Sequence, residues 1–339
     1  MKRVGYVSHR SSLAHEMPAG HPERADRIRA ITEQLEVTGL VAELLQHSPE
    51  RAPRALVELA HDHALVALLD ELDERGGGRI DLDTSMGPHS LDAALRATQG
   101  AVDAAAKVLS GEWDAALTCM RPPGHHARPR VPMGFCLVNH VAVAARWALT
   151  QDGINRVAIL DWDAHHGNGT QEIFWTDPDV LYMSLHQYPW YPGTGDLTER
   201  GEGDGFRSTI NVPLPAETAE DAYERAMGDV IEPAVAAFAP DLVFVSAGFD
   251  SHHHDPLCMM RLSAGAYFRF TERIAAWGRG PVCVLEGGYD LHGLSRSVAA
   301  TVSALLELDE PVGVEGAEVA PLAGTPEAQA WVERAVELR

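Results

Sequence analysis

Short apolar runs alternate with amphipathic stretches along almost the whole chain. The amphipathic stretches carry apolar residues at helical spacing and span about 22–38, 91–110, 138–150, 219–238, 263–277 and 295–307. The apolar runs have the length of buried β-strands and span residues 4–7, 115–119, 157–160, 180–185, 209–213, 242–247 and 282–285. Strands that alternate with helices in this way predict a mostly parallel sheet between two layers of helices.

The pattern predicts one α/β domain with three layers over residues 1–339. A chain of 339 residues is long for one domain, but no linker and no internal repeat divides it. Residues 309–339 are expected to form a loop and then a short helix that begins near Thr325 and Pro326.

Composition excludes several classes of protein. A formal net charge of -22 and the lack of a lysine- or arginine-rich stripe argue against nucleic-acid binding, while cationic substrates remain compatible with it. No apolar run approaches the roughly 18 residues that span a bilayer, and no secretory signal precedes the first predicted strand. The four cysteines lack metal-binding spacing and are expected to be reduced. We therefore expect a cytoplasmic protein without membrane contact.

Polar groups gather at the carboxyl ends of five predicted strands. Ligands of an open parallel sheet bind outside this edge, so the groups are expected to form one site. The segments concerned are RPPGHHA (121–127), DWDAHHGNG (161–169), His186, GFDSHHHDP (248–256) and EGGY (286–289).

The segment at 161–169 has the character of a metal site. Asp161, Asp163 and His165 share parity, so they point to the same side while the chain stays extended. Carboxylates and imidazoles suit zinc, and a catalytic zinc takes three protein ligands. Asp163 and His165 supply two, and Asp255 is the best third candidate. A two-manganese hydrolase of the arginase type remains the alternative.

Two further features suit catalysis. His125 and His126 can serve as general acid and base near neutral pH. Tyr289 follows Gly287 and Gly288, which allow a close approach of the loop, so its hydroxyl can donate to an oxyanion. Simple packing of Tyr289 in a turn is the alternative.

These motifs together resemble the zinc-dependent histone deacetylase family, especially its class II branch and bacterial amidohydrolase relatives. The resemblance also rests on GHPERADRIRAI (20–31), GFCLVNHVAVAA (134–145) and LEGGYDL (285–291), which occur in the family's order. It implies an arginase/deacetylase-like fold and a zinc ion held by Asp163, His165 and Asp255.

The resemblance also implies roles for residues around the zinc ion. Asp161 corresponds to the residue that orients His125, and Asn168 corresponds to the partner of His126. A carboxylate stabilises an imidazolium whereas an amide adds no charge, so His125 is expected to stay protonated and His126 to act as the neutral base. The peptide carbonyls of Asp161, Asp163 and His165, with Ser184 and Leu185, resemble the family's inner potassium site.

The predicted substrate site follows the family less closely. The position of Arg24 resembles that of a residue in the family's internal acetate channel. Leu262 corresponds to the position where a polyamine-selective relative carries an acidic gatekeeper. The histidines 252–254 are expected either to line the entrance or to form a polar loop without a catalytic role. The substrate contacts implied by the resemblance are Gly134, Phe135, Tyr191, Leu262, Gly287 and Gly288.

The sequence therefore predicts a zinc-dependent amidohydrolase that removes acetyl or other short acyl groups from acyl-lysine side chains. The expected partner is an acetylated lysine peptide or an acetylated small amine, and self-association into a homo-oligomer stays open. The alternatives are an acetylpolyamine deacetylase and a non-catalytic acyl-lysine-binding protein.

Overall fold

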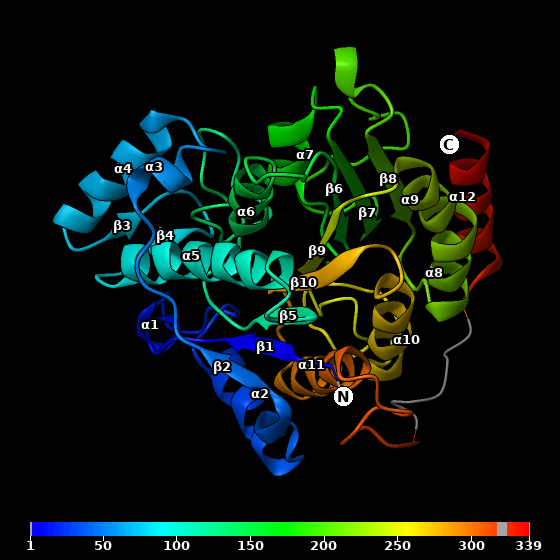
Figure 1. The fold of residues 1–339 in the computed structure, drawn as a ribbon, viewed down its shortest axis with the longest axis horizontal. Helices are drawn as coiled ribbons and strands as arrows, with labels where there is room; N and C mark the ends of the chain where they lie inside the picture. The colour runs from blue at the N-terminus through cyan, green and yellow to red at the C-terminus, as the bar shows by residue number, and fades with distance from the viewer. Residues whose placement is uncertain (1, 317–323, 339) are drawn as a thin grey trace.

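The computed structural model describes residues 2–316 and 324–338 and confirms the three-layer α/β fold (Figure 1). The central sheet has eight strands in the order β2-β1-β5-β10-β9-β6-β7-β8, and its neighbouring strands run parallel. Its strands are β1 (Val4–Val7), β2 (Leu45–His47), β5 (Ala115–Thr118), β6 (Val157–Asp161), β7 (Val180–Gln187), β8 (Thr209–Leu214), β9 (Leu242–Ala247) and β10 (Arg279–Leu285). Only β2 was not predicted, because this short edge strand contains no apolar run.

Both faces of the sheet are covered, which explains why its strands are apolar at consecutive positions. In β9, Leu242 and Phe244 pack into the core on one side of the sheet, and Val243 and Val245 pack into the core on the other. The side chains of a strand alternate between faces, so a strand covered on both sides is apolar throughout.

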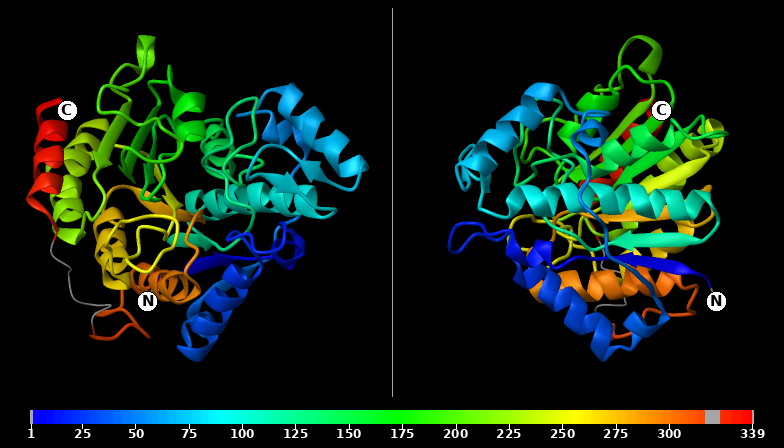
Figure 2. Two further views of the ribbon diagram at one scale, coloured as in Figure 1. Left: turned by 180° about the vertical axis from the view of Figure 1, so that it is seen from behind. Right: turned by 60° about the vertical axis from the view of Figure 1, so that its left-hand side comes forward.

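The two helical layers are unequal. One face is covered by α5 (Ser90–Leu109), α6 (His140–Ala148) and α7 (Asn168–Phe174). The opposite face is covered by α2 (Asp26–Val37), α8 (Glu220–Ala226), α9 (Glu232–Phe238), α10 (Ala264–Ile274), α11 (Leu291–Leu305) and α12 (Pro326–Leu338). In the right-hand view of Figure 2, strands β1 and β5 lie between α5 and α11. A π-helical turn, Met227–Ile231, interrupts the helix predicted at 219–238.

Several elements were not predicted, and all but the helix at 63–74 are very short. Most of them lie between residues 40 and 86, where the sequence predicted no element. They are α1 (Ser11–Ala14), α3 (Arg54–Val57), α4 (His63–Glu74), the antiparallel pair β3 (Gly78–Arg79) and β4 (Ser85–Met86), and the 3-10 turns Leu40–Glu43 and Gly203–Gly205.

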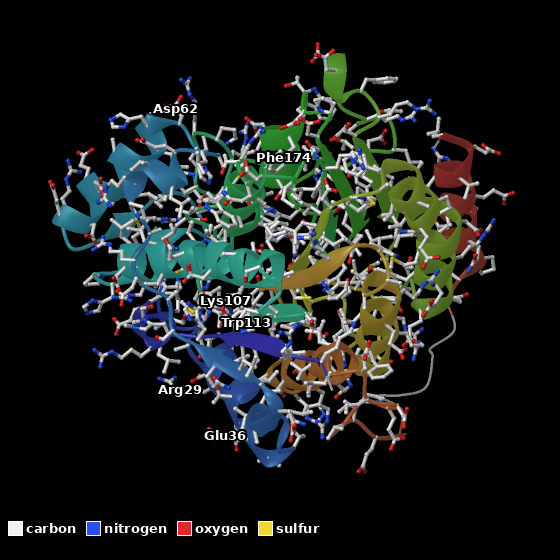
Figure 3. All side chains as sticks on the ribbon, in the orientation of Figure 1. Arg29, Glu36, Asp62, Lys107, Trp113 and Phe174 are labelled. Atoms are coloured by element: carbon white, nitrogen blue, oxygen red, sulfur yellow. The ribbon has the colours of Figure 1, made fainter. Side chains whose placement is uncertain are left out.

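Helix α2 shows how an amphipathic pattern is used and where it is broken. Ile31 and Leu35 face the core, whereas Arg29 and Glu36 point outward at the edge of the molecule (Figure 3). Arg27 is an exception because it is fully buried on the inner side. A buried arginine needs polar partners, so its contacts with the site are important.

The order of the strands brings the predicted site segments together. β5, β10, β9 and β6 are consecutive in the sheet, and the segments after them carry the histidine pair, Tyr289 and the candidate metal ligands. Within the described residues, no helix combines the length and apolarity needed to cross a bilayer. The four cysteines are buried and none forms a disulfide.

Candidate active site

His125 and His126 lie side by side in the loop after β5, with ring centroids 4.0 Å apart. His125 donates from Nδ1 to Oδ2 of Asp161 over 3.1 Å, and the hydroxyl of Tyr182 donates to the same oxygen over 3.2 Å. Burial opposes a charge on His125, but the carboxylates of Asp163, Asp161 and Glu286 outweigh it and raise the pKa of His125 to about 10. His125 is therefore an imidazolium at neutral pH.

Glu286 holds the loop that carries this pair, a role that its sequence motif does not specify. Its Oε2 accepts hydrogen bonds from the backbone N–H of Gly124 over 2.6 Å and of His125 over 3.1 Å. Burial raises the pKa of Glu286 to about 7, although the charge of His125 acts in the opposite direction. The loop after β5 is thus fixed by the first residue after β10.

His126 has a different environment. Its Nδ1 lies 2.8 Å from Oδ1 of Asn168, so Nδ1 donates and Nε2 keeps its lone pair. Burial, followed by the positive charges of His125 and His165, lowers the pKa of His126 well below its ordinary value. The pair therefore combines one cationic and one neutral imidazole.

Three buried side chains form a candidate metal centre. Nδ1 of His165 lies 3.2 Å from Oδ1 of Asp163 and 3.0 Å from Oδ2 of Asp250. Backbone N–H groups hold both carboxylates, because Gly287 donates to Oδ2 of Asp163 over 2.8 Å and Ala164 donates to Oδ1 of Asp250 over 2.8 Å. Two carboxylates this close together in the interior repel each other, so a positive charge between them would stabilise both.

The structure places Asp255 outside this cluster. Its Oδ2 accepts from the backbone N–H of Tyr289 over 2.7 Å and of Asp290 over 3.3 Å, and its Oδ1 accepts from Leu257 over 2.9 Å. Asp250, the third residue after β9, occupies the position that was assigned to Asp255. Its closeness to the strand end was the sequence signal that could have identified it.

The loop after β10 brings Gly287, Gly288 and Tyr289 to the same place. A Cβ at Gly287 would lie 2.3 Å from Oδ2 of Asp250 and 2.6 Å from Oδ2 of Asp163, so only glycine fits beside the carboxylates. Gly288 has a φ of 113°, which also favours glycine.

The buried side chain of Arg27 holds the backbone of this loop. It donates from Nε to the carbonyl of Gly288 over 2.6 Å and also donates to the carbonyl of Glu286. Its guanidinium lies 5.1 Å from the centroid of the Tyr289 ring. Arg24, which was expected near an internal channel, instead lies at the surface beside Asp26, with 52% of its side chain exposed.

Aromatic rings surround the histidines and Tyr289. The ring of Tyr191 lies 5.1 Å from that of His126, and the ring of Phe135 lies 5.8 Å from that of Tyr289. Gly134 has a φ of 55°, and a Cβ there would lie 2.5 Å from Cδ2 of His126. Gly134, Phe135 and Tyr191 therefore lie beside the catalytic candidates, and their contact with a substrate stays a prediction.

Other predicted positions lie elsewhere. Leu262 is 0% exposed and belongs to the hydrophobic core, so it cannot contact a substrate at a rim. His252 is buried, and a Cβ at Gly293 in α11 would lie 2.4 Å from its Nδ1. His254 is exposed, with its ring 6.5 Å from that of His292. His252 and His254 therefore lie toward α11, whereas Nδ1 of His253 lies 3.1 Å from the carbonyl oxygen of Leu262.

The predicted inner potassium site lies on two strands that are neighbours in the sheet. Asp161 pairs with Ser184 in the β6–β7 register, and Leu185 is the next residue of β7. The hydroxyl of Ser184 lies 2.8 Å from Nδ1 of His186. Potassium binding stays a prediction.

Comparison with known proteins gives a consistent result. Residues 21–305 match the histone deacetylase domain. A protein of Archaeoglobus fulgidus named "Probable deacetylase" is 41% identical over 86% of this chain and 82% of its own length. The histone deacetylase-like amidohydrolase of Pseudomonas aeruginosa is 37% identical over 86% of this chain and 82% of its own.

A solved structure agrees with these relatives. The crystal structure of the HDA15 HD domain superposes with a TM-score of 0.91 and 33% identity, and the match covers 99% of this chain and 94% of that one. The fold is therefore the arginase/deacetylase-like fold that the resemblance implied. This chain belongs to the histone deacetylase family.

Proposed function

We propose that the protein is a zinc-dependent deacetylase that hydrolyses the amide of acyl-lysine side chains. The observation that carries the proposal is the pairing of a neutral imidazole, His126, with a buried cluster of two carboxylates and an imidazole. A base next to a divalent metal is the arrangement needed to activate water against an amide.

The donor set fits zinc. Asp163, His165 and Asp250 offer two oxygen ligands and one nitrogen ligand, and a catalytic zinc site keeps three protein ligands. A doubly charged ion bound there would offset the mutual repulsion of the two buried carboxylates. A zinc ion held there supplies Lewis acidity toward the amide carbonyl and the attacking water.

His126 is the proposed general base. Asn168 holds Nδ1 as a donor, so Nε2 is the atom that can take a proton from the attacking water. The cationic His125 keeps the pKa of His126 low, which leaves the base neutral before the reaction. Once protonated, His126 can return the proton to the leaving amine, because the nearby positive charges favour its loss.

Tyr289 is the proposed oxyanion donor. Burial raises the pKa of Tyr289 well above its ordinary value, so the hydroxyl keeps its proton at neutral and mildly alkaline pH. Asp255 and Arg27 fix the backbone around Tyr289, and such preorganisation makes a donor effective toward charge that appears only in the transition state. Asp255 is thus assigned a supporting role.

The substrate is proposed to be the acylated amine of a flexible chain, with acyl-lysine peptides preferred. The aromatic rings of Phe135 and Tyr191 provide apolar walls for an alkyl stem. An acetylated polyamine is the second candidate, favoured by the net charge of -22. An inner potassium ion at Asp161, Ser184 and Leu185 remains part of the proposal.

The test is a panel of acylated amines assayed with the purified protein, together with metal analysis. We expect one zinc per chain and hydrolysis of an acetyl-lysine peptide. Two manganese ions per chain, or no release of acetate from any acylated amine at saturating zinc, would contradict the proposal. A non-catalytic acyl-lysine-binding protein would bind the peptide without releasing acetate.

A further inference from the structure

Cys258 lies against the candidate metal centre. Its Sγ is 3.4 Å from Nε2 and 3.9 Å from Nδ1 of His165. The sulfur, a ring nitrogen of His165 and a carboxylate oxygen of Asp250 all lie within 4.8 Å of one another. Cys258 therefore joins two of the proposed zinc ligands, His165 and Asp250, in a cluster that could hold a metal ion.

The backbone around Cys258 is held on both sides. The N–H of Leu257 donates to Oδ1 of Asp255 over 2.9 Å, and the N–H of Met259 donates to Oε1 of Gln187 over 2.8 Å. The carbonyl of Leu257 accepts a hydrogen bond from the indole of Trp190 over 3.1 Å. Cys258 is 8% exposed, so the sulfur is kept inside the site.

The distances are compatible with a shared tetrahedral ion. Ordinary zinc–ligand lengths place a nitrogen and an oxygen ligand about 3.3 Å apart, and a nitrogen and a sulfur ligand about 3.6 Å apart. Nδ1 of His165 lies 3.0 Å and 3.2 Å from the two carboxylate oxygens and 3.9 Å from Sγ of Cys258. A divalent ion between His165, Asp250 and Cys258 would draw these three ligand atoms together, and sulfur is a ligand that zinc accepts readily.

We propose that the sulfur of Cys258 is the fourth metal ligand in the substrate-free protein, and that substrate displaces it. This rests on the proposed function, which requires an open fourth position during catalysis. When the sulfur binds, its proton passes to solvent and a water molecule leaves the ion. When substrate and water enter, the sulfur is released and takes up a proton again. No oxidation or reduction is involved.

The test is the absorption spectrum of the cobalt(II)-substituted full chain. Cobalt(II) bound to a thiolate shows a sulfur-to-metal charge-transfer band in the near ultraviolet, which oxygen and nitrogen ligands do not give. We expect the band in the wild type and in Cys283→Ser, a control whose cysteine is buried in β10. We expect its loss in Cys258→Ser. A wild type without the band, or a Cys258→Ser protein that keeps it, overturns the proposal.

A second variant and a metal chelator provide two further tests. Cys258→Ala serves as a second variant, and thermal melts verify that the variants are folded. A short alkyl hydroxamate, which chelates through oxygen, should abolish the band of the wild type when calorimetry shows that it is bound. A band that survives saturating hydroxamate overturns the displacement step.

The kinetic consequence separates this proposal from the proposed function. If about nine-tenths of the resting protein has sulfur on the metal, Cys258→Ser should raise kcat/KM by about tenfold, because the competent fraction is no longer limiting. An unchanged or lower kcat/KM in a variant that has lost the band contradicts occlusion by sulfur. Failure of every form to hydrolyse an acylated amine contradicts the proposed function, while the cobalt spectrum still decides whether Cys258 is a ligand.

Discussion

The loops after β6 and β9 both follow buried strands, yet the sequence specified their site residues very differently. Asp161, the last residue of β6, and Asp163 and His165 in the loop after it reach the site as their alternation predicted. In the loop after β9, the expected metal ligand was Asp255, and the structure brings Asp250 to His165. The difference is the distance from the end of the strand. Asp163 is two residues beyond β6 and Asp250 is three residues beyond β9, whereas Asp255 is eight residues beyond β9.

The largest expected effect separates the two aspartates of the second loop. Asp250→Ala should lose stoichiometric zinc and detectable turnover, since two protein ligands remain where three are needed. Asp255→Ala should retain zinc and lose about 10- to 100-fold in kcat, as is usual for residues that support a site indirectly. Metal analysis of both variants decides the matter. If Asp255→Ala loses zinc and Asp250→Ala retains it, then Asp255 is the third metal ligand, as the sequence predicted.

The histidine pair gives the next largest effect. His126→Ala should reduce kcat by about 10²- to 10⁴-fold, because it deletes the base, and His125→Ala should be less damaging. Buffers should not rescue His126→Ala at any pH near neutrality. Equal losses in the two variants would contradict the division of roles.

The pH dependence of kcat/KM tests the same division of roles between His125 and His126. A base works only when deprotonated, so kcat/KM should fall on the acid side through the pKa of His126, which lies well below 6.5. Because the charge of His125 contributes to lowering the pKa of His126, His125→Ala should move this acid limb to higher pH. An acid limb that stays in place would mean that another group controls it.

A substitution of Tyr289 tests the loop after β10, which contacts both the loop after β6 and the loop after β9. Tyr289→Phe should lower kcat by about 10²- to 10³-fold with little change in KM, the usual cost of one oxyanion donor. Phe135→Leu provides a matched control, because Phe135 lies beside Tyr289 without a hydroxyl and should mainly change KM. A mainly KM effect of Tyr289→Phe would make it a substrate contact.

The sequence allowed prediction of features set by short-range periodicity. Seven strands of the sheet follow from apolar runs. The pairing of His125 with Asp161 and of His126 with Asn168 was implied instead by the resemblance to the family. The supporting residues did not follow, because Arg27 and Glu286 act through contacts that depend on how distant loops fold against one another. Arg27 lies three residues after the predicted Arg24. Arg27 is on the buried face of α2, whereas Arg24 precedes this helix and is exposed.

The smallest expected effect concerns substrate choice at the rim, where the structure changes the residue to be tested. Leu262 is buried, so Leu262→Glu would place a charge in the core and destabilise the fold. Leu257 is half-buried on the loop between Asp255 and Cys258, and its carbonyl contacts the exposed Trp190. Leucine can pack on an aliphatic stem but cannot pair with an ammonium group.

Two further acidic groups, Asp81 and Asp83, lie near the ring of Tyr191. Both raise the pKa of Tyr191, so they lie close to the aromatic wall, and burial followed by Asp81 raises the pKa of Asp83. We expect the wild type to prefer an acetyl-lysine peptide over acetylspermidine, and Leu257→Glu to shift the ratio of kcat/KM values toward the polyamine by about tenfold, equivalent to about 1.4 kcal/mol. Leu257→Gln is the matched control without charge and should shift it little. If the wild type prefers the polyamine by tenfold and Asp83→Asn removes that preference, the loop at 81–83 sets specificity and the lysine assignment is wrong.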